Sequence, residues 1–291
     1  MAIITVDHLR KTYGTRVAVE DVSFSVKEGE VFGIVGRNGA GKTTTVECVA
    51  GLRTPTAGTV TVDADLKEQV GVQLQECSLP DKIRVGEALA LYASFYARPA
   101  DWRALAEEAG LDLRAPFGKL SGGQRQRLSV ALALVGSPRI AILDELTTGL
   151  DPRARRETYD LIARIRERGV TILLVTHFME EVERLCDRVA VISRGRVRAV
   201  DTPEGLVARA GGEQRLVFHT DEPVDALRAL PEVASVTVAD GANGPEVTVT
   251  GTGELLSAVA AVLPPSRTRG LRMERTTLDD AFLVLTGQEE S

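Results

Sequence analysis

The segment GRNGAGKT at residues 36–43 constrains the fold more than any other part of the chain. It fits the pattern G-x-x-x-x-G-K-[ST], and it follows VFGIVG at 31–36, a continuous apolar run typical of a buried parallel strand. A helix is predicted directly after it, over 43–52, ending near Gly51 and before Pro55. In such a strand–loop–helix unit, backbone N–H groups and the helix N-terminus bind phosphate together. The segment therefore predicts a phosphate loop in an α/β sheet, and with it a nucleotide site.

The residue types of this loop indicate how a nucleotide would be held. Backbone N–H groups turn around the phosphate oxygens, Lys42 reaches the β- and γ-phosphates, and the Thr43 hydroxyl is a ligand for Mg²⁺. The residues predicted to contact ATP here are Gly36, Arg37, Asn38, Gly39, Ala40, Gly41, Lys42, Thr43 and Thr44. The alternative is a chance glycine turn, because the pattern fixes only four positions. The flanking strand and helix argue against it.

A second apolar strand, predicted over 139–143, is followed by two acids. Beside a phosphate loop, Asp144 is placed to hold Mg²⁺ through water, and Glu145 to polarise the attacking water as a general base. Taken alone, the pair would more often be two acids on a solvated turn. A small-molecule kinase or a GTPase could share both elements, so they indicate the nucleotide but not the task.

The order of predicted elements favours two domains. Strands alternate with helices along the first two thirds of the chain, which is typical of a mostly parallel sheet covered on both faces. Strands are predicted over 3–7, 22–27, 31–36, 59–62, 70–74, 139–143, 170–175, 190–193 and 196–200, and helices over 43–52, 86–97, 124–135, 153–168 and 179–186. From residue 216 the order β-α-β-β-α-β predicts a small α+β domain with the ferredoxin-like pattern.

Charge supports the same division. The chain has 291 residues and a net charge of −6, but residues 213–291 hold 6 Arg, no Lys and 13 acids. The preceding 212 residues hold 29 basic and 28 acidic side chains and are nearly neutral. Because the shift coincides with Gly211 and Gly212, we predict an ATPase domain over 1–212 and an accessory or regulatory domain over 213–291.

Composition excludes several classes of protein. With 44% hydrophobic and 26% charged residues the chain is expected to fold, and its acidity argues against a nucleic-acid partner. No run approaches 18 apolar residues, and the N-terminus MAIITVDHLRK does not have the form of a secretory signal. The three cysteines are far apart and predict neither a disulfide frame nor a metal cluster. A reducing cytoplasm is the expected compartment.

The segment LSGGQRQR at 120–127 reduces the number of possible functions for this nucleotide site. It predicts a second anion-binding turn at a helix N-terminus, although the chain has only one lysine-bearing loop. Here the chain resembles the ATP-binding-cassette (ABC) family, whose signature is LSGGQ. The resemblance implies a homodimer of two cassettes arranged head-to-tail, with each ATP between one phosphate loop and the signature of the other subunit. The signature residues it implies are Ser121, Gly122, Gly123 and Gln124.

Further motifs of the family follow in order. Tyr13 in KTYG resembles the aromatic residue that stacks on adenine, although strand-end tyrosines are usually just surface residues. Gln75 matches the glutamine that senses the γ-phosphate and Mg²⁺, with Gln73 as a nearby competitor. Asp151, in TGLD, resembles the loop that crosses the dimer interface. His177, which follows the strand VTILLVT, matches the switch histidine at the γ-phosphate. The resemblance thus implies Lys42, Gln75, Glu145 and His177 as catalytic residues, and Thr43, Gln75 and Asp144 as residues at the Mg²⁺ site.

Within the family, HFMEEVERLCDRVAVISRGRV and the compact helical region, about 76–135, resemble the ATPases of drug- and antibiotic-exporting, ABC-2 type systems. RTTLDDAFLVLTG at 275–287 is similar to the end of an accessory domain on many of them. One departure is Leu146, which stands where a proline commonly follows the Asp-Glu pair and could loosen the turn that carries Glu145.

The resemblance also implies partners and a location. A separate integral-membrane permease would dock near residues 76–120, which hold five of the chain's twelve aromatic residues. The chain would then lie peripherally on the cytoplasmic face of the membrane, with ATP and Mg²⁺ as cofactors. Export of a drug, antibiotic or other hydrophobic compound is the leading prediction. A lipid or polysaccharide exporter, an importer and a soluble ABC ATPase that does not transport are the alternatives.

Overall fold

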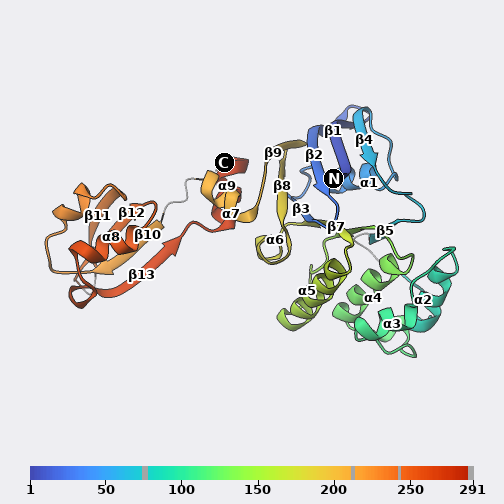
Figure 1. Cartoon of the computed structure of the whole chain (residues 1–291). Coiled ribbons are helices and arrows are strands. Elements are labelled where there is room, and N and C mark those ends of the chain that lie inside the picture. Colours follow the sequence, from blue (N-terminus) through green and yellow to red (C-terminus); the bar gives the residue numbers. More distant parts are fainter. Residues whose placement is uncertain (74–77, 211–213, 242–243, 288–291) are drawn as a thin grey trace. The chain divides into compact units, whose positions relative to one another are not determined.

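A computed structural model describes residues 1–73, 78–210, 214–241 and 244–287 of the chain. It divides into two compact units, Met1–Pro203 and Glu204–Ser291. The composition places the change at residue 212, whereas the geometric division falls nine residues earlier, so that helix α7 (Pro203–Arg209) lies almost entirely in the second unit. Each unit is described here by itself (Figure 1).

The first unit is built on one nine-stranded sheet with the order β4-β1-β2-β9-β8-β3-β7-β6-β5. Its strands are β1 (Ala2–Tyr13), β2 (Arg16–Lys27), β3 (Val31–Val35), β4 (Ala57–Val62), β5 (Val70–Gln73), β6 (Ile140–Asp144), β7 (Thr171–Thr176), β8 (Arg188–Ser193) and β9 (Arg196–Asp201). All nine strands expected from the sequence of this unit are present, although β1 and β2 are much longer than their apolar cores indicated. The two pair as an antiparallel ribbon whose register shifts at several points, which allows strands of 12 residues to bend.

The sheet has a parallel part and an antiparallel part. Strand β3 pairs in parallel with β7 and β8, and β6 pairs in parallel with β5 and β7. At the other side β1 pairs antiparallel with β2 and β4. Every residue of β3, β6 and β7 is buried, as the continuous apolar runs predicted. The carboxyl ends of these three strands therefore meet at one edge of the sheet, where ligands bind in open α/β sheets.

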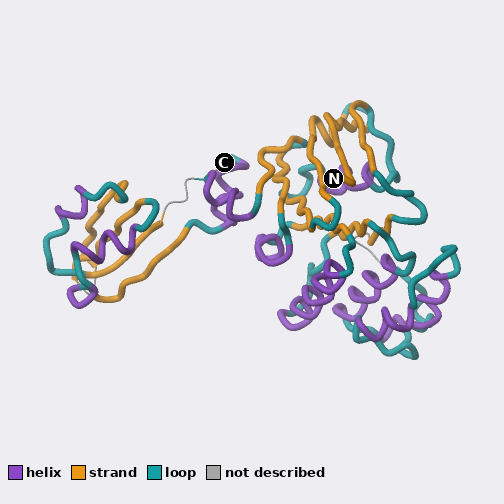
Figure 2. The backbone as a smooth tube through the Cα atoms, in the orientation of Figure 1, coloured by secondary structure: helices purple, strands orange, loops and turns teal. Residues whose placement is uncertain are grey.

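The helices confirm the predicted types and correct some boundaries. They are α1 (Lys42–Val49), α2 (Val85–Ala93), α3 (Trp102–Glu108), α4 (Gly122–Leu134), α5 (Pro152–Glu167) and α6 (Met179–Leu185). Helices α2, α3 and α4 pack on one another in a helical cluster, and α4 also packs against β5 and α5 (Figure 2). The expected helix over 86–97 ends at Ala93, and α3 was not predicted. Its sequence signal is Asp101, whose carboxylate accepts hydrogen bonds from the backbone N–H groups of Arg103 and Ala104.

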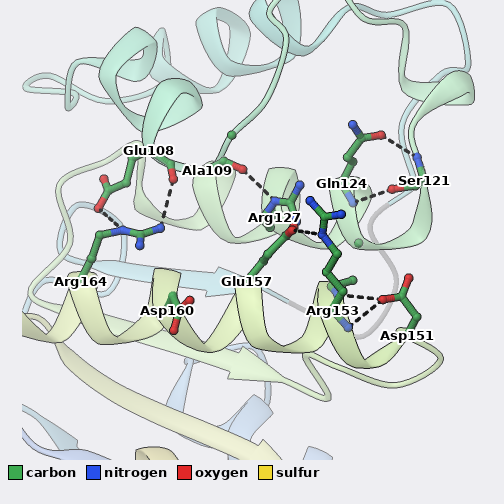
Figure 3. A pocket seen from close by; sticks show the side chains of 13 residues that line it. Glu108, Ala109, Ser121, Gln124, Arg127, Asp151, Arg153, Glu157, Asp160 and Arg164 are labelled. Carbon is green, nitrogen blue, oxygen red and sulfur yellow. Dashed lines mark hydrogen bonds and ion pairs between the residues drawn. The ribbon is translucent and has the colours of Figure 1, made fainter.

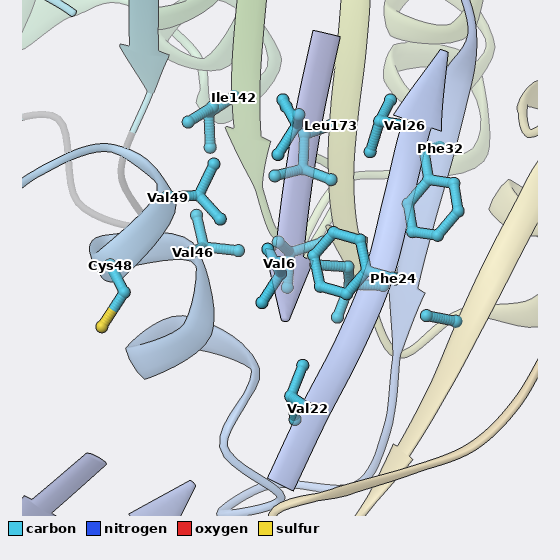
Figure 4. Close-up of a cluster of buried hydrophobic side chains, with 14 of the residues drawn as sticks. Val6, Val22, Phe24, Val26, Phe32, Val46, Cys48, Val49, Ile142 and Leu173 are labelled. Atoms are coloured by element: carbon cyan, nitrogen blue, oxygen red, sulfur yellow. The ribbon is translucent and has the colours of Figure 1, made fainter. Parts of the chain in front are cut away.

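A hydrophobic core contains side chains from the antiparallel and the parallel parts of the sheet and from the buried face of α1 (Figure 4). Phe24 of β2 stacks on Phe32 of β3, with ring centroids 5.2 Å apart. Val46 and Val49 of α1 lie in the same cluster, each 1% exposed. Burial of side chains of this size stabilises the fold by about 1.5–3 kcal/mol each. The core therefore fixes α1, and with it the phosphate loop, against the end of β3.

The second unit contains a four-stranded antiparallel sheet with the order β11-β12-β10-β13. Its elements are β10 (Gln214–His219), the short 3-10 helix η2 (Asp225–Ala229), β11 (Val233–Gly241), β12 (Gly244–Gly251), α8 (Leu255–Val262), β13 (Arg269–Arg275) and α9 (Leu278–Thr286). One face of the sheet packs Leu216, Phe218 and Val249 against Leu227 of η2 and Val259 of α8. Among the residues described in either unit, no helix is long and apolar enough to cross a membrane.

Candidate functional site

The phosphate loop lies between the end of β3 and the start of α1, as predicted. Its first glycine is required by a close approach: a Cβ atom at Gly36 would lie 2.3 Å from the backbone oxygen of Ile192. The turn between β8 and β9 supports the loop from the same side, because the Gly195 N–H donates a hydrogen bond of 3.0 Å to the Ala40 oxygen. Strand β8 and the β8–β9 turn thus support the shape of the loop.

A cavity of about 370 Å³ opens over this loop. It is lined by Arg16, Val17, Ala18, Asn38, Gly39, Gly41, Lys42, Thr43, Thr44 and Glu145. The structure therefore brings six of the nine predicted loop residues and Glu145 to one space. The sequence reasoning missed Arg16 to Ala18, which begin β2; their signal was adjacency to Tyr13 and Gly14 in the preceding turn.

Lys42 is buried in this structure and turned onto its own loop. Its Nζ donates hydrogen bonds to the backbone oxygens of Gly36, at 2.8 Å, and Arg37, at 3.2 Å. Burial lowers the pKa of Lys42, and the charges of Glu145 and Asp144 oppose that shift. The Lys42 amine therefore lies close to the carboxylates of Asp144 and Glu145.

Asp144 and Glu145 differ in burial and in geometry. Asp144 ends β6 and is 1% exposed, and its Oδ1 has no hydrogen-bond partner among the described residues. Burial, and then the charge of Glu145, raises the pKa of Asp144 to about 6. Glu145 has a φ of 49°, a left-handed conformation that costs a non-glycine residue about 1–2 kcal/mol. Backbone strain of this kind concentrates at functional sites.

His177 meets Glu145 at the same edge of the sheet. Its Nδ1 lies 3.4 Å from Glu145 Oε1, and its ring lies 4.1 Å from that of Phe178, centroid to centroid. The two residues follow β6 and β7, which are parallel neighbours. Two residues predicted to act in catalysis, 32 positions apart in the sequence, are therefore adjacent in space. Leu146, the departure from the family pattern, is 1% exposed, so its side chain is buried directly after Glu145.

The residues present fit a magnesium ion. Asp144 offers a buried carboxylate oxygen without a partner, and the exposed Thr43 hydroxyl lines the cavity at the start of α1. Hard oxygen ligands of this kind suit Mg²⁺. Gln75, the third predicted ligand, lies outside the described residues. Its competitor Gln73 is 3% exposed, and its Oε1 accepts a hydrogen bond of 3.0 Å from the Asp144 N–H.

Asp144→Asn is expected to raise the unfolding temperature of the magnesium-free chain. The raised pKa of Asp144 means that its folded surroundings disfavour the charged form, so a neutral amide should gain about 1–2 kcal/mol of stability. Thermal unfolding in EDTA at pH 7.5 measures this, and added Mg²⁺ with ATP should stabilise the wild type more than the variant. A variant less stable than the wild type in EDTA contradicts the expectation.

Tyr13 ends β1 and is 39% exposed, outside the set that lines the cavity. Lys11 Nζ lies 5.3 Å and the Arg53 guanidinium carbon 5.8 Å from its ring centroid. The ring is thus an exposed aromatic surface beside two cations, close in the sequence to the start of β2, which lines the cavity. A planar base could stack there.

The signature residues lie elsewhere, around a second cavity of about 680 Å³ (Figure 3). Ser121 caps α4: its Oγ accepts a hydrogen bond from the Gln124 N–H, and Gln124 Oε1 accepts one from the Ser121 N–H. Ser121, Gly123, Gln124 and Asp151 line this cavity, which shares no lining residue with the one over the phosphate loop. Within one chain, therefore, the two turns predicted to bind anions lie at separate cavities.

The starts of α4 and α5 are packed closely at this second cavity. A Cβ atom at Gly123 would lie only 2.7 Å from the Ala154 Cβ. Arg127 and Arg153 both pair with Glu157 of α5, and Arg127 Nε also donates to the Ala109 oxygen at 2.8 Å (Figure 3). Asp151 caps α5 by accepting from the N–H groups of Arg153 and Ala154. The signature turn and the Asp151 loop therefore form one continuous face.

Comparison with known proteins agrees with this geometry. A family model described as ABC transporter matches residues 19–148. The chain is 37% identical to the Nod factor export ATP-binding protein I of Ralstonia nicotianae, over 99% of this chain and 94% of that protein. It is 31% identical to the linearmycin resistance ATP-binding protein of Bacillus subtilis, over 98% of this chain and 99% of that protein.

Solved structures give the same result for the fold. The ATP-binding subunit of an ABC transporter has a TM-score of 0.65 at 28% identity, covering 72% of this chain and 93% of that one. A bacterial ABC transporter cassette solved as a dimer has a TM-score of 0.61 at 25% identity, covering 68% of this chain and 98% of that one. The chain therefore belongs to the ABC transporter family, as an ATP-binding and ATP-hydrolysing subunit of the exporter type.

Proposed function

We propose that the chain drives export of a drug, antibiotic or other hydrophobic compound through a separate membrane permease, from the cytoplasmic face of the membrane. The observation that carries the proposal is that Lys42 and Glu145 line one cavity, with His177 3.4 Å from Glu145, while signature residues line another. Relatives named for Nod factor export and linearmycin resistance support the direction of transport.

Hydrolysis starts with ATP in the phosphate-loop cavity. Backbone N–H groups of residues 38–44 and the Lys42 amine bind the phosphates, and the Tyr13 ring stacks on the base. Lys42 exchanges its two backbone acceptors, the oxygens of Gly36 and Arg37, for phosphate oxygens. Because the Lys42 amine is already buried, binding a phosphate oxygen costs little further desolvation of the amine.

Glu145 is the general base of the reaction. Its carboxylate takes a proton from the water that attacks the γ-phosphorus, as the bond to the β–γ bridging oxygen breaks. His177, 3.4 Å from Glu145, orients that carboxylate and donates a hydrogen bond to the γ-phosphate. Thr43 and Asp144 would hold Mg²⁺, which neutralises charge on the phosphate oxygens when bound. Glu145, whose backbone is in the left-handed conformation, lines the cavity in which the γ-phosphate would lie.

A homodimer completes the site. Ser121, Gly122, Gly123 and Gln124 of a second copy supply N–H groups and hydroxyl to the γ-phosphate in a head-to-tail arrangement, and Asp151 lies on the same face. Isologous pairing of this kind is the commonest form of homodimer. ATP binding closes the dimer and hydrolysis opens it again.

The second unit is proposed to regulate or stabilise the dimer rather than to catalyse. Its strand order β11-β12-β10-β13, with η2 and α8 between the strands in sequence, supports a ferredoxin-like fold. None of the nucleotide motifs lies in residues 213–291, which carry the acidic excess of the chain. On the charge boundary, the proposed ATPase domain covers 1–212 and the accessory domain 213–291, nine residues beyond the geometric division.

The permease is proposed to dock on the helical region, near residues 76–120. Phe95 follows α2 and is 68% exposed, and Leu91, four residues earlier in α2, is 48% exposed. Phe117, in contrast, is buried at 5% exposure, and the ring of Tyr96 fills the space at Gly136. The outer end of α2 therefore offers the apolar anchors that protein interfaces favour.

Phe95→Ser is expected to leave the ATPase activity of the isolated chain within about 2-fold and to lower its affinity for the permease about 10-fold or more. Truncating a buried interface aromatic commonly costs about 2 kcal/mol of binding free energy. Affinity is measured by surface plasmon resonance on permease in nanodiscs. Leu256→Ser, which changes an exposed apolar residue of the second unit, is the control. Unchanged binding of the Phe95 variant places the interface elsewhere.

Transport itself tests the proposal as a whole. The chain would be purified with the membrane protein encoded beside it, reconstituted in vesicles, and assayed for ATPase activity with hydrophobic drugs. Stimulation by such compounds, and their ATP-dependent accumulation in inside-out vesicles, is the expected result. Stimulation by a lipid-linked sugar or a lipid alone instead would favour the polysaccharide or lipid exporter.

A further inference from the structure

Behind His177 lies a buried carboxyl group that the mechanism above does not use. Glu181 of α6 is 1% exposed, in a helix whose neighbouring acids Glu180 and Glu183 both face solvent. Burial raises the pKa of Glu181, and the nearby hydroxyl groups of Thr147 and Thr176 partly offset that cost. Burying a carboxyl group is unfavourable compared with burying a leucine of similar volume. Its position therefore has to be explained by its contacts.

Glu181 contacts both loops that carry the proposed chemistry. Its Oε1 accepts a hydrogen bond from the Thr147 hydroxyl, and Thr147 is fully buried two residues after Glu145. Thr176, the last residue of β7, is near enough to lower the pKa of the same carboxyl group, and it directly precedes His177. Its Oε2 is also buried, and no described residue donates a hydrogen bond to it. The Glu181 side chain thus links the turn after β6 to α6, the helix that begins two residues after His177.

The same turn leads to the dimer face. The Leu150 N–H donates a hydrogen bond of 3.1 Å to the Thr147 oxygen, and Asp151 follows directly as the cap of α5. Tyr159 of α5 is 1% exposed, and burial, followed by the charge of Glu181, raises its pKa to about 12. A displacement of Thr147 would therefore move Glu145 on one side and the Asp151 loop on the other.

We propose that Glu181 is a positioning residue for hydrolysis: its carboxyl holds Thr147, and through it fixes Glu145 relative to His177. This rests on the proposed function, since it assigns a role in that same reaction. The alternative is that Glu181 only fills space beneath α6. The two differ in outcome, because a filler can be replaced by an apolar residue of similar volume without loss of turnover.

The test compares variants of the full-length chain. Glu181→Leu removes the hydrogen-bond acceptor at similar volume, Glu181→Gln keeps an acceptor for Thr147, and Thr147→Val removes the donor. We expect Glu181→Leu and Thr147→Val each to lower kcat by ~10-fold or more with KM for ATP within ~2-fold, because a small misplacement of a catalytic group can cost up to ~100-fold. Glu181→Gln should retain most of kcat, and Thr147→Ser should restore what Thr147→Val loses.

Stability and coupling separate positioning from packing. Glu181→Leu should unfold at the same temperature as the wild type or higher, so its loss of kcat cannot come from unfolding. The Glu181→Leu, Thr147→Val double variant should be no slower than either single variant, because both remove one contact. Glu183→Gln, an exposed acid on the same helix, is the control. A Glu181→Leu kcat within 2-fold of the wild type overturns the proposal.

The proposed function is tested separately in the same series. Wild type and Glu145→Gln are assayed beside the Glu181 variants. Equal turnover in these two would refute the assignment of Glu145, whatever Glu181 does. A large effect at Glu145 with none at Glu181 or Thr147 refutes only the positioning role.

Discussion

Glu145→Gln should lower ATP turnover by ~10²–10⁴-fold, the contribution typical of a general base, while ATP still binds. The amide has nearly the shape of the carboxylate, so the cavity and the contact with His177 are kept, but it cannot accept the proton of the attacking water. Because the product is not formed, the ATP-bound dimer should accumulate. Single-turnover hydrolysis, a fluorescent-ATP titration and size-exclusion chromatography with Mg²⁺ and ATP measure the three consequences.

Glu183→Gln is the matched control for this variant, because it makes the same chemical change at an exposed position of α6. It should leave turnover, ATP affinity and oligomeric state unchanged. Wild-type turnover in Glu145→Gln would remove Glu145 from the role of base. A variant that remains monomeric with bound ATP would instead contradict the head-to-tail dimer.

Gly123→Ala should lower turnover by ~10²-fold without affecting binding of ATP to the monomer. The added methyl group would lie 2.7 Å from the Ala154 Cβ, so the start of α4 has to move away from α5. That movement separates the signature turn from the Asp151 loop, and a displacement of this size in a positioned group can cost ~10²-fold in rate. The phosphate-loop cavity shares no residue with this face, so nucleotide affinity should stay within about 2-fold.

Two further variants identify the cause. Ala154→Gly removes the methyl group that Gly123→Ala would meet, so the double variant should recover most of the turnover, less the ~1 kcal/mol of stability that glycine costs in a helix. Gly122→Ala adds the same methyl group one residue earlier, where the nearest atom, a Leu150 methyl carbon, is 3.8 Å away. It should not disturb the packing of α4 on α5. Failure of Ala154→Gly to rescue would show that contact with ATP, not packing, makes glycine necessary at position 123.

Much of the first unit could be predicted because its signals are local. The continuous apolar runs of β3, β6 and β7 predict strands that are buried on both faces. The glycines and the lysine of residues 36–43 predict a phosphate loop at the end of β3. The helix type of α4 and α5 follows from their periodicity and from the caps Ser121 and Asp151. These features depend on residues within a few positions of one another.

Other features were missed because their causes lie far away in the sequence. Arg16 to Ala18 line the nucleotide cavity only because the β1–β2 ribbon folds over the loop. The sequence MEEVERL does not predict burial of Glu181, because its three glutamates all have the spacing of solvent-exposed residues. Glu181 is buried because α6 packs against the turn that carries Thr147. The length of α2 was overestimated because GEALALYASFYA has helical periodicity beyond the point where the chain turns at Ser94.

By itself, the sequence of residues 36–43, together with LSGGQRQR and the Asp-Glu pair, determined the fold of the first unit and the chemistry to expect, because each motif combines residue types that phosphate chemistry requires at short spacing. The tertiary structure alone decided which residues meet. It placed His177 Nδ1 3.4 Å from Glu145 Oε1, because parallel pairing of β6 and β7 aligns the carboxyl ends of these strands. It also separated the signature from the phosphate loop, because α4 packs on α5 rather than on α1.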